Sequence, residues 1–430
     1  MFLKRMDRFP AIITSISFFF RFLVPSVLIA SVLIAFVFIP SVLLIPSVSE
    51  ASWKICTIQS LNHFNYYYSI HSIALDDQEC VHLAYGDGAG NLNHLRSLDR
   101  ENYLVWLAEE IHDVNEVNGF AALALDTSNN PHFCYCSYDG HLIYAHKKGG
   151  KWASHIIDDS KNINPSASIG MDSQGVVHIS YYDARQKRLK YVTFNESKRE
   201  SIDEFEFVSE VVDDSEGAGT ESSLALDSAG NVHIAYYDKV QQNLKYACKT
   251  EGKDWSMETV DSDGNIGYSP SLAVDGDGRP CISYCDWTNR NLKYAFRSGE
   301  EWITETVDGS PDKTTEKTGD FTALALDHKG RPHISYFSQT AHALMYAAHD
   351  GKTWQIQVVN RDEDIEGPTS LALDSSGQAH IIYYNYTTNS LKYAISKEST
   401  QPAERKSIQP AQGDARTLSI GCFLSAVKIL

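Results

Sequence analysis

Histidine and aspartate are the residues of this chain whose spacing first suggests chemistry. An aspartate ends the pattern Ile/Leu-x-x-Asp seven times, roughly once every 50 residues, and a histidine stands six residues later in six of the seven copies. Histidine is the usual side chain for acid–base catalysis and metal binding near neutral pH. The pairs are Asp76/His82, Asp126/His132, Asp172/His178, Asp227/His233, Asp327/His333 and Asp374/His380, and Cys281 takes the histidine's place after Asp275.

The repetition of these pairs favours a structural role over a catalytic one. A single active site does not need one histidine per repeat, and a metal site needs several ligands in one place. We interpret the pairs as bonds across a hairpin, or as a packed ring between repeats. The sequence therefore assigns no catalytic residue and no metal ligand.

The elements that position these residues are short strands. Around Asp227, four runs rich in β-branched and aromatic residues are separated by turn signals, at 223–227, 233–238, 244–247 and 255–261. Seven such units predict an all-β, seven-bladed β-propeller over residues 52–396, with four antiparallel strands per blade. The first run begins at Trp53 and copies a fourth strand, whereas the last, at 391–394, copies a third strand. We expect the N-terminal strand to complete the last blade and close the ring.

A tight turn follows the aspartate in each unit. Asp, two polar residues and then Gly are typical of a type I turn that ends in a left-handed residue, and Gly or Asn stands there in six units. Glu79 holds this position in the first unit, so we expect a distorted or longer hairpin there. An aromatic residue begins each fourth strand, from Trp53 to Trp354, and we predict that these rings pack between blades.

Aromatic and polar residues gather in the irregular loops, which join fourth to first and second to third strands. Binding residues concentrate on variable loops over a rigid scaffold. Aromatic rings beside carboxylates and amides suit sugars, whose C–H faces stack while their hydroxyls form hydrogen bonds. The alternative is that several of these side chains plug the ring. The candidates are His63, Tyr66, Tyr67, Tyr68, Tyr138, Asp139, Tyr268, Asp286, Trp287 and Tyr386.

The charge of the chain excludes some partners. The net charge is −18, and the two terminal segments are slightly basic, so the acidic charge lies in the repeats. An acidic body repels phosphate backbones and anionic membranes, which speaks against nucleic-acid binding. Acidic pairs in the loops, such as Asp158-Asp159 and Asp213-Asp214, could supply some oxygens for calcium, but none matches an EF-hand loop, and we interpret them as solvated loop acids. No cofactor is expected.

The two termini predict where the protein resides. Residues 1–51 begin with Lys4, Arg5 and Arg8 and continue into an apolar stretch without charge from Phe22 to Ile45. This is a long signal peptide or a transmembrane signal anchor. Either one places the propeller outside the cytoplasm, as a secreted, periplasmic or membrane-anchored surface protein. Residues 397–430 form a polar linker with a short apolar tail. We expect a monomer that meets the membrane only through its N-terminal segment.

One motif carries a resemblance to known proteins. Asp-x-x-Gly-x-x-His-Ile-x-Tyr-Tyr-Asp, followed by Leu-Lys-Tyr-Ala, occurs at 227–247 and resembles repeats of secreted bacterial β-propellers of the sialidase-like, BNR-type group. The resemblance implies the fold. The sialidase box Ser-x-Asp-x-Gly-x-x-Trp differs, because here Gly stands three after Asp and His replaces Trp, and no arginine triad is visible. Some propeller polysaccharide lyases look similar at Gly-x-x-His-Ile.

These observations favour a non-enzymatic, extracytoplasmic binding propeller whose irregular loop face recognises a glycan or a protein. The first alternative is a carbohydrate-active enzyme, a polysaccharide lyase or glycosidase, that uses the same face. The second is a structural envelope protein.

Overall fold

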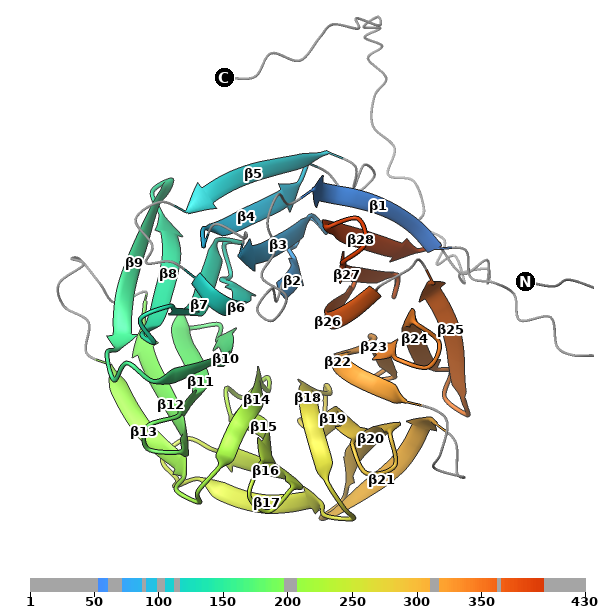
Figure 1. The fold of residues 1–430 in the computed structure, drawn as a ribbon. Coiled ribbons are helices and arrows are strands. Elements are labelled where there is room, and N and C mark those ends of the chain that lie inside the picture. The colour runs from blue at the N-terminus through green and yellow to red at the C-terminus, as the bar shows by residue number, and fades with distance from the viewer. Residues whose placement is uncertain are drawn as a thin grey trace, which may run out of the picture. The chain divides into compact units, whose positions relative to one another are not determined.

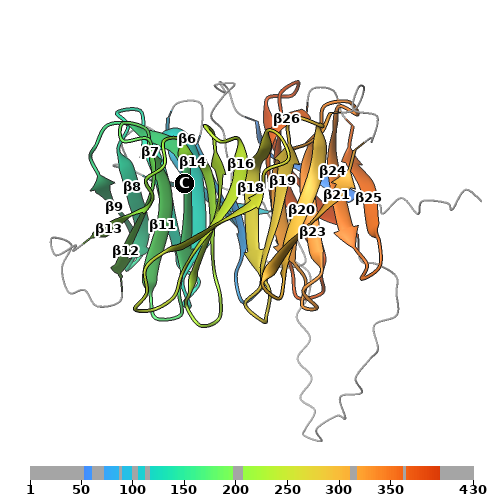
Figure 2. The ribbon, with the colours of Figure 1, turned by 90° about the horizontal axis from the view of Figure 1, so that it is seen from below.

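The computed structural model describes residues 53–60, 72–86, 90–98, 105–111, 117–196, 207–309, 317–361 and 365–397. Within these ranges the chain forms 28 strands in seven four-stranded antiparallel sheets. The sheets stand around a ring (Figure 1), which Figure 2 shows edge-on. The prediction of a seven-bladed β-propeller is confirmed. The two predicted terminal segments lie outside the described residues. Within the described residues, no helix is long and apolar enough to cross a membrane.

The blades follow the chain, and each runs from an inner strand at the channel to an outer strand at the rim. Blades 1 to 3 and the closing strand consist of β1 (Trp53–Ser60), β2 (Ser72–Leu75), β3 (Val81–Gly86), β4 (Leu92–Ser97), β5 (Trp106–Ile111), β6 (Val117–Leu125), β7 (Pro131–Ser137), β8 (Leu142–Lys148), β9 (Lys151–Asp158), β10 (Ile163–Met171), β11 (Val176–Asp183), β12 (Arg188–Asn195) and β13 (Val208–Asp213). Blades 4 to 7 consist of β14 (Ala218–Leu226), β15 (Val232–Asp238), β16 (Asn243–Lys249), β17 (Ser256–Asp261), β18 (Ile266–Val274), β19 (Pro280–Asp286), β20 (Asn291–Ser298), β21 (Glu301–Asp308), β22 (Thr318–Leu326), β23 (Pro332–Ser338), β24 (Ala343–His349), β25 (Trp354–Asn360), β26 (Ile365–Leu373), β27 (Ala379–Asn385) and β28 (Ser390–Ser396).

The ring closes between the two ends of the propeller. Strand β1 pairs with β28 in antiparallel register, with Trp53 opposite Ser396, and becomes the outer strand of blade 7 in the order β26-β27-β28-β1. The expected closure is therefore confirmed. Joining strands from both ends of the chain in one sheet covers the edge of β28, which would otherwise be open.

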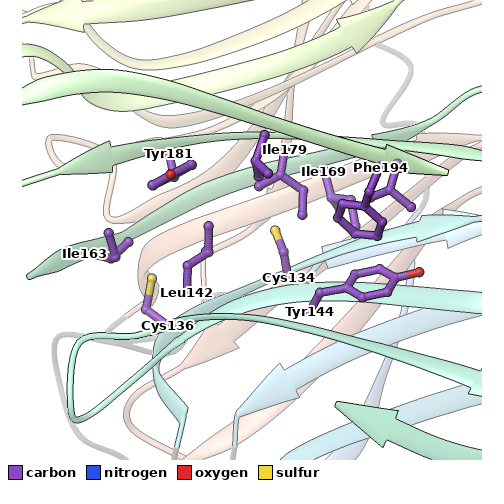
Figure 3. Close-up of a cluster of buried hydrophobic side chains, with 11 residues drawn as sticks. Cys134, Cys136, Leu142, Tyr144, Ile163, Ile169, Ile179, Tyr181 and Phe194 are labelled. Atoms are coloured by element: carbon purple, nitrogen blue, oxygen red, sulfur yellow. The ribbon is translucent and has the colours of Figure 1, made fainter. Parts of the chain in front are cut away.

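The hydrophobic core lies between blades. The second strands β7, β15, β19, β23 and β27 are buried along their whole length, because a neighbouring blade covers each face. Among the described residues the core divides into seven clusters, and each cluster joins two adjacent blades. Figure 3 shows the cluster in which Cys134 and Tyr144 of blade 2 meet Ile179 and Phe194 of blade 3. Fully burying one such side chain contributes about 1.5–3 kcal/mol.

The aromatic residue at each outer strand packs on the preceding blade, as predicted. Trp302, for example, meets Tyr246 edge-on, with ring centroids 5.1 Å apart, and its indole N–H donates to Glu258 at 2.9 Å. Such aromatic pairs contribute about 0.5–1.5 kcal/mol beyond the area they bury. Further pairs of this kind are Trp53–Tyr346, Trp106–Tyr393, Trp255–Tyr191 and Trp354–Tyr294.

The hairpin after the inner strand keeps one geometry, and this corrects the expectation for blade 1. Glu79 adopts the left-handed conformation, with φ 61°, and its N–H donates to the carbonyl of Asp76 at 2.8 Å. The hairpin is neither distorted nor lengthened. The Glu79 carboxylate accepts the backbone N–H of Ser375 in blade 7 at 3.1 Å, and this bond helps to offset the cost of positive φ.

Candidate ligand-binding site at the mouth of the central channel

The site begins with an irregularity at the start of the inner strands. In β14 the pairing shifts register between Ala218 and Ser222, and β6, β10, β18, β22 and β26 shift near the same place. Such bulges leave residues outside the ladder and re-aim their side chains. Ser269 and Phe321 adopt positive φ there, 48° and 53°, which non-glycine residues hold only where their surroundings enforce it. Tertiary packing therefore shapes this end of the strands.

Glycines allow these bulges to approach the preceding blade closely. A Cβ on Gly267 would lie 2.8 Å from Cα of Leu244, and a Cβ on Gly319 would lie 2.7 Å from Cα of Leu292. Both residues also have positive φ, 103° and 90°. A side chain would collide with backbone atoms here, so only glycine fits. The close approach sets the starting position of the residues that follow, Tyr268 and Asp320.

A cavity of about 600 Å³ opens where the inner strands of all seven blades converge. Pockets for small ligands fall in this size range. Serine, threonine and alanine from the inner strands form much of its wall, while Tyr182, Tyr237 and Lys239 reach it from the ends of the second strands. The start of β14 and the end of β15 both line it, so it lies on the face of the irregular loops.

One acidic group, Glu221, and one lysine, Lys239, line this mouth, and Asp320 comes directly before the lining residue Phe321. Glu221 accepts the backbone N–H of Ser269 in the next blade at 2.5 Å, and Asp320 accepts from the side-chain amide of Gln339 at 2.7 Å. Burial raises the pKa of Glu221 and outweighs the hydrogen bonds from Ser269, which lower it. The negative charge of Asp320 raises the pKa further, and Lys239 lowers it. Glu221 therefore keeps its proton to a higher pH than an exposed glutamate does.

Three aromatic rings lie against each other beside these charges. The ring centroids of Tyr237 and Tyr268 are 4.2 Å apart, with 32° between the planes, and those of Tyr268 and Trp287 are 5.3 Å apart. The Tyr237 hydroxyl donates to the side-chain oxygen of Asn265 at 2.8 Å, which orients its ring. Trp287 ends the row and is 46% exposed. An open aromatic surface next to hydrogen-bonding groups is suited to a sugar ring.

The structure brings together some predicted ligand-binding residues and separates others. Tyr268 and Trp287 lie in the aromatic row. Tyr138 and Tyr386 hold the same position in blades 2 and 7 as Trp287 in blade 5, directly after the second strand. Tyr138 and Asp139 are exposed, whereas Tyr386 packs edge-on against Tyr384 with ring centroids 4.7 Å apart. Four further candidates, His63, Tyr66, Tyr67 and Tyr68, lie outside the described residues.

Asp286 serves the turn beneath Trp287. It is only 2% exposed, and its carboxylate accepts both the backbone N–H of Asn289 at 2.8 Å and the side-chain amide of the same residue at 2.7 Å. Asp183 and Asp238 close the corresponding turns of blades 3 and 4. This geometry positions the loop and leaves little of the Asp286 carboxylate open to a ligand.

The sequence prediction missed the polar half of the mouth. Tyr182, Glu221, Lys239 and Asp320 were not among the candidates. The sequence contains a signal for Lys239, because the residue directly after the second strand has the same place in each of the six blades where it is described. The set contains Tyr138, Ala184, Lys239, Trp287, Gln339 and Tyr386, and only its aromatic members are among the predicted ligand-binding residues.

The repeated Asp–His pairs lie in the hairpins between first and second strands, at the other end of the inner strands. In blade 4 the Asp227 carboxylate accepts the N–H groups of Ala229 and Asn231, and it lies 3.5 Å from Nε2 of His233. The other ring nitrogen of His233 lies 2.6 Å from the Tyr246 hydroxyl. Burial lowers the pKa of His233, so the neutral form is favoured. The same arrangement recurs at His132, His178, His333 and His380.

The acidic loop residues proposed for calcium have other partners. Asp213 accepts from the Tyr236 hydroxyl at 2.7 Å and from the Lys245 ammonium at 2.5 Å, both in the next blade. Asp158 and Asp261 make equivalent bonds. Over the described ranges no group of three or more His, Cys, Asp or Glu side chains is arranged to hold a metal ion. These carboxylates join blades to one another.

Together these features define a seven-bladed β-propeller with a ligand-sized cavity at the channel mouth. No family model matches the chain, and no curated protein matches its sequence. It is similar in structure to the BP39L lectin from Burkholderia pseudomallei, with TM-score 0.62 and 11% identity over 77% of this chain and 96% of that chain.

Two further solved structures are less similar. The six-bladed propeller lectin from Aleuria aurantia has TM-score 0.46 and 12% identity, over 70% of this chain and 97% of that chain. The polysaccharide lyase Uly1 has TM-score 0.47 and 10% identity, over 80% and 94% respectively. At these identities the likeness is one of fold.

Proposed function

We propose that the protein is a carbohydrate-binding propeller that holds a glycan at the mouth of its central channel. The observation that carries this proposal is the row of Tyr237, Tyr268 and Trp287 beside Glu221 and Lys239 at the edge of a cavity of about 600 Å³. The C–H face of a sugar would stack on Trp287, and its hydroxyls would exchange hydrogen bonds with Glu221 and Lys239. A lectin with the same type of fold supports the proposal.

The proposal extends to the compartment. A basic and then apolar N-terminal segment precedes the propeller, so we place the mouth outside the cytoplasm, where glycans of cell surfaces and matrices are found. Cell fractionation of the full chain checks this placement. Recovery of the propeller in the cytoplasmic fraction would contradict it.

The experiment that tests glycan binding compares two variants with similar loss of exposed apolar surface. A glycan array first identifies a ligand for the full-length protein, and calorimetry then measures its affinity. We expect Trp287→Ala to weaken binding about tenfold or more, since loss of one aromatic platform removes roughly 1–3 kcal/mol. Met257→Ala, at a 48% exposed position on the outer strand β17, serves as the control and should bind normally.

Two results would contradict the proposal. One is an array without any bound glycan, and the other is equal affinity in Trp287→Ala and Met257→Ala. Both variants should remain folded. The exposed Met257 contributes less than about 0.5 kcal/mol to stability, and loss of the Trp287–Tyr268 ring contact costs at most about 0.5–1.5 kcal/mol, so both melting temperatures should stay close to that of the parent protein.

One observation favours a second function, glycan cleavage at the same mouth. The pKa of Glu221 is raised by burial, and a raised pKa is the direction that general acid catalysis by a carboxyl requires. Incubating the protein with acidic polysaccharides and chromogenic glycosides distinguishes cleavage from binding. Turnover that is abolished by Glu221→Gln would show that the protein cleaves glycans. Binding without turnover would support a protein that only binds them.

A further inference from the structure

A second cavity lies between blades 1 and 2. It measures about 420 Å³ and is bounded by Asp76, His82 and His94 of blade 1 and by Asn129 and Lys147 of blade 2. Asp76 and Asn129 belong to the hairpins that follow the inner strands. The cavity therefore lies toward the opposite end of the inner strands from the channel mouth, and ligands in the two cavities would not touch.

The cavity occurs where blade 1 departs from the repeat. In the other six blades the third strand carries a tyrosine whose ring fills the seam, as Tyr144 does in blade 2, but blade 1 has His94. This imidazole is shorter than a tyrosine side chain and leaves room beside it. Its Nε2 lies 3.1 Å from Nδ1 of His82.

The other nitrogen of His94 has only a long contact, to the carboxylate of Glu109. His94 is 4% exposed, and its Nδ1 has no hydrogen-bond partner among the described residues. The closest carboxylate oxygen, on Glu109, is 3.6 Å away. A buried polar atom without a partner at the wall of a cavity costs roughly 1–3 kcal/mol, which a hydrogen-bonding ligand would recover.

Two ion pairs flank the histidines and balance each other. Arg96 donates to Asp76 at 2.7 Å, and Lys147 donates to Glu109 at 2.5 Å. Because each positive group is matched by a carboxylate, the lining offers no excess charge of either sign to attract a charged ligand. A neutral ligand with several hydroxyls would instead add hydrogen bonds to both pairs without breaking either.

The rim of the cavity supplies an apolar surface. Leu107 of β5 is 50% exposed and borders the opening. A sugar combines apolar C–H groups with hydroxyls that both donate and accept, which matches this lining. We propose that the cavity between blades 1 and 2 is a second ligand site that binds a neutral saccharide unit.

The decisive variant is His94→Tyr, which restores in blade 1 the residue of the other six blades and fills the cavity. Ligand-observed NMR with the methyl glycosides of glucose, galactose, mannose and fucose measures binding, and methyl glucuronide tests the anionic case. The assay is made in the Trp287→Ala background so that the channel mouth contributes little. We expect a neutral glycoside to bind this background at millimolar concentration and at least tenfold more weakly once His94→Tyr is added.

Leu107→Arg provides an independent test, since an exposed rim residue can change without harm to folding. It should also weaken binding, while melting temperatures show that both variants are folded. Equal binding with and without His94→Tyr, no binding of any glycoside to the Trp287→Ala background, or preferred binding of the glucuronide would overturn the proposal. Binding at the mouth is judged separately, in His94→Tyr alone, so the two sites succeed or fail independently.

Discussion

The two ends of the inner strands follow a similar backbone path from blade to blade in the described ranges but differ in their chemistry. At the hairpin end an aspartate accepts the same backbone N–H groups in each blade, as Asp227 and Asp374 do. At the channel end the bulged positions vary between the described blades, with Glu221, Ser269 and Phe321 at one equivalent place in blades 4 to 6. Uniform chemistry serves the scaffold, and varied chemistry over the same scaffold leaves room for recognition.

The largest expected effect comes from breaking the ring that supports both ends. Internal deletion of residues 52–60 removes β1, with Trp53, Cys56 and Ile58 packed on the cores of two seams. These side chains are partly buried, so each contributes part of the about 1.5–3 kcal/mol of full burial, and the lost pairing of β1 with β28 adds to this, for a total of about 5 kcal/mol. We expect Tm to fall by at least about 10 °C in calorimetry.

Removal of residues 398–430 is the matched control for this deletion, since it also shortens the chain next to β28 but leaves the strand pairing intact. It should leave Tm unchanged. A deletion of 52–60 that melts like the parent protein would show that β1 is dispensable for the ring.

The next effect compares two carboxylates, Asp374 at the hairpin end and Glu221 at the channel end, whose contributions to stability should depend on pH in opposite ways. Burial alone would raise the pKa of Asp374, but hydrogen bonds from His380, Ser376 and the Gln378 N–H outweigh it and lower the pKa to about 2. A lowered folded pKa contributes stability above the unfolded value, about 3.9, and this contribution is lost as pH falls toward 2. Asp374→Asn should therefore cost about 1 kcal/mol at pH 7, after allowance for solvent screening, and progressively less below about pH 4.

Glu221 should behave in the opposite way, because its pKa is raised by burial. Its protonated form is favoured in the folded protein, so its contribution is present below the unfolded value, about 4.3, and is lost as pH rises through the folded pKa. Glu221→Gln should thus gain stability relative to the parent as pH rises. Urea unfolding from pH 3 to 8, with Glu251→Gln at an exposed turn as control, tests both. Parallel profiles for Asp374→Asn and Glu221→Gln would refute the contrast.

The smallest effect concerns the hairpin end of blade 1. Glu79→Gly relieves a positive φ of 61°, which favours the variant by about 1 kcal/mol, but it also removes the bond to Ser375. We expect a net change in unfolding free energy below about 1 kcal/mol, measured by urea titration. Gly377→Ala, which puts a side chain at φ 82° in blade 7, is the converse control and should destabilise. A large loss in Glu79→Gly would mean that the bond to blade 7 dominates.

The sequence determined the ring because the repeat is local. Each unit such as 223–261 contains its own strands, turn and capping aspartate, so blade number, strand order and closure at Trp53 could be read directly. The partners of the tryptophans and histidines also follow from the repeat once blades are adjacent. The prediction from turn chemistry was wrong at Glu79, where a hydrogen bond to Ser375 of blade 7 helps to hold the regular turn.

Tertiary structure alone decided the two cavities. The bulges at Glu221 and Asp320 interrupt the alternation of a strand, so no pattern along the chain shows which side chains enter the channel. The seam at His94 differs from its neighbours by one residue, and only the packing of blade 1 on blade 2 shows that the change leaves a space. The repeat pattern predicts the features that the blades share. A binding site depends instead on residues that differ between blades and that only the folded ring brings together.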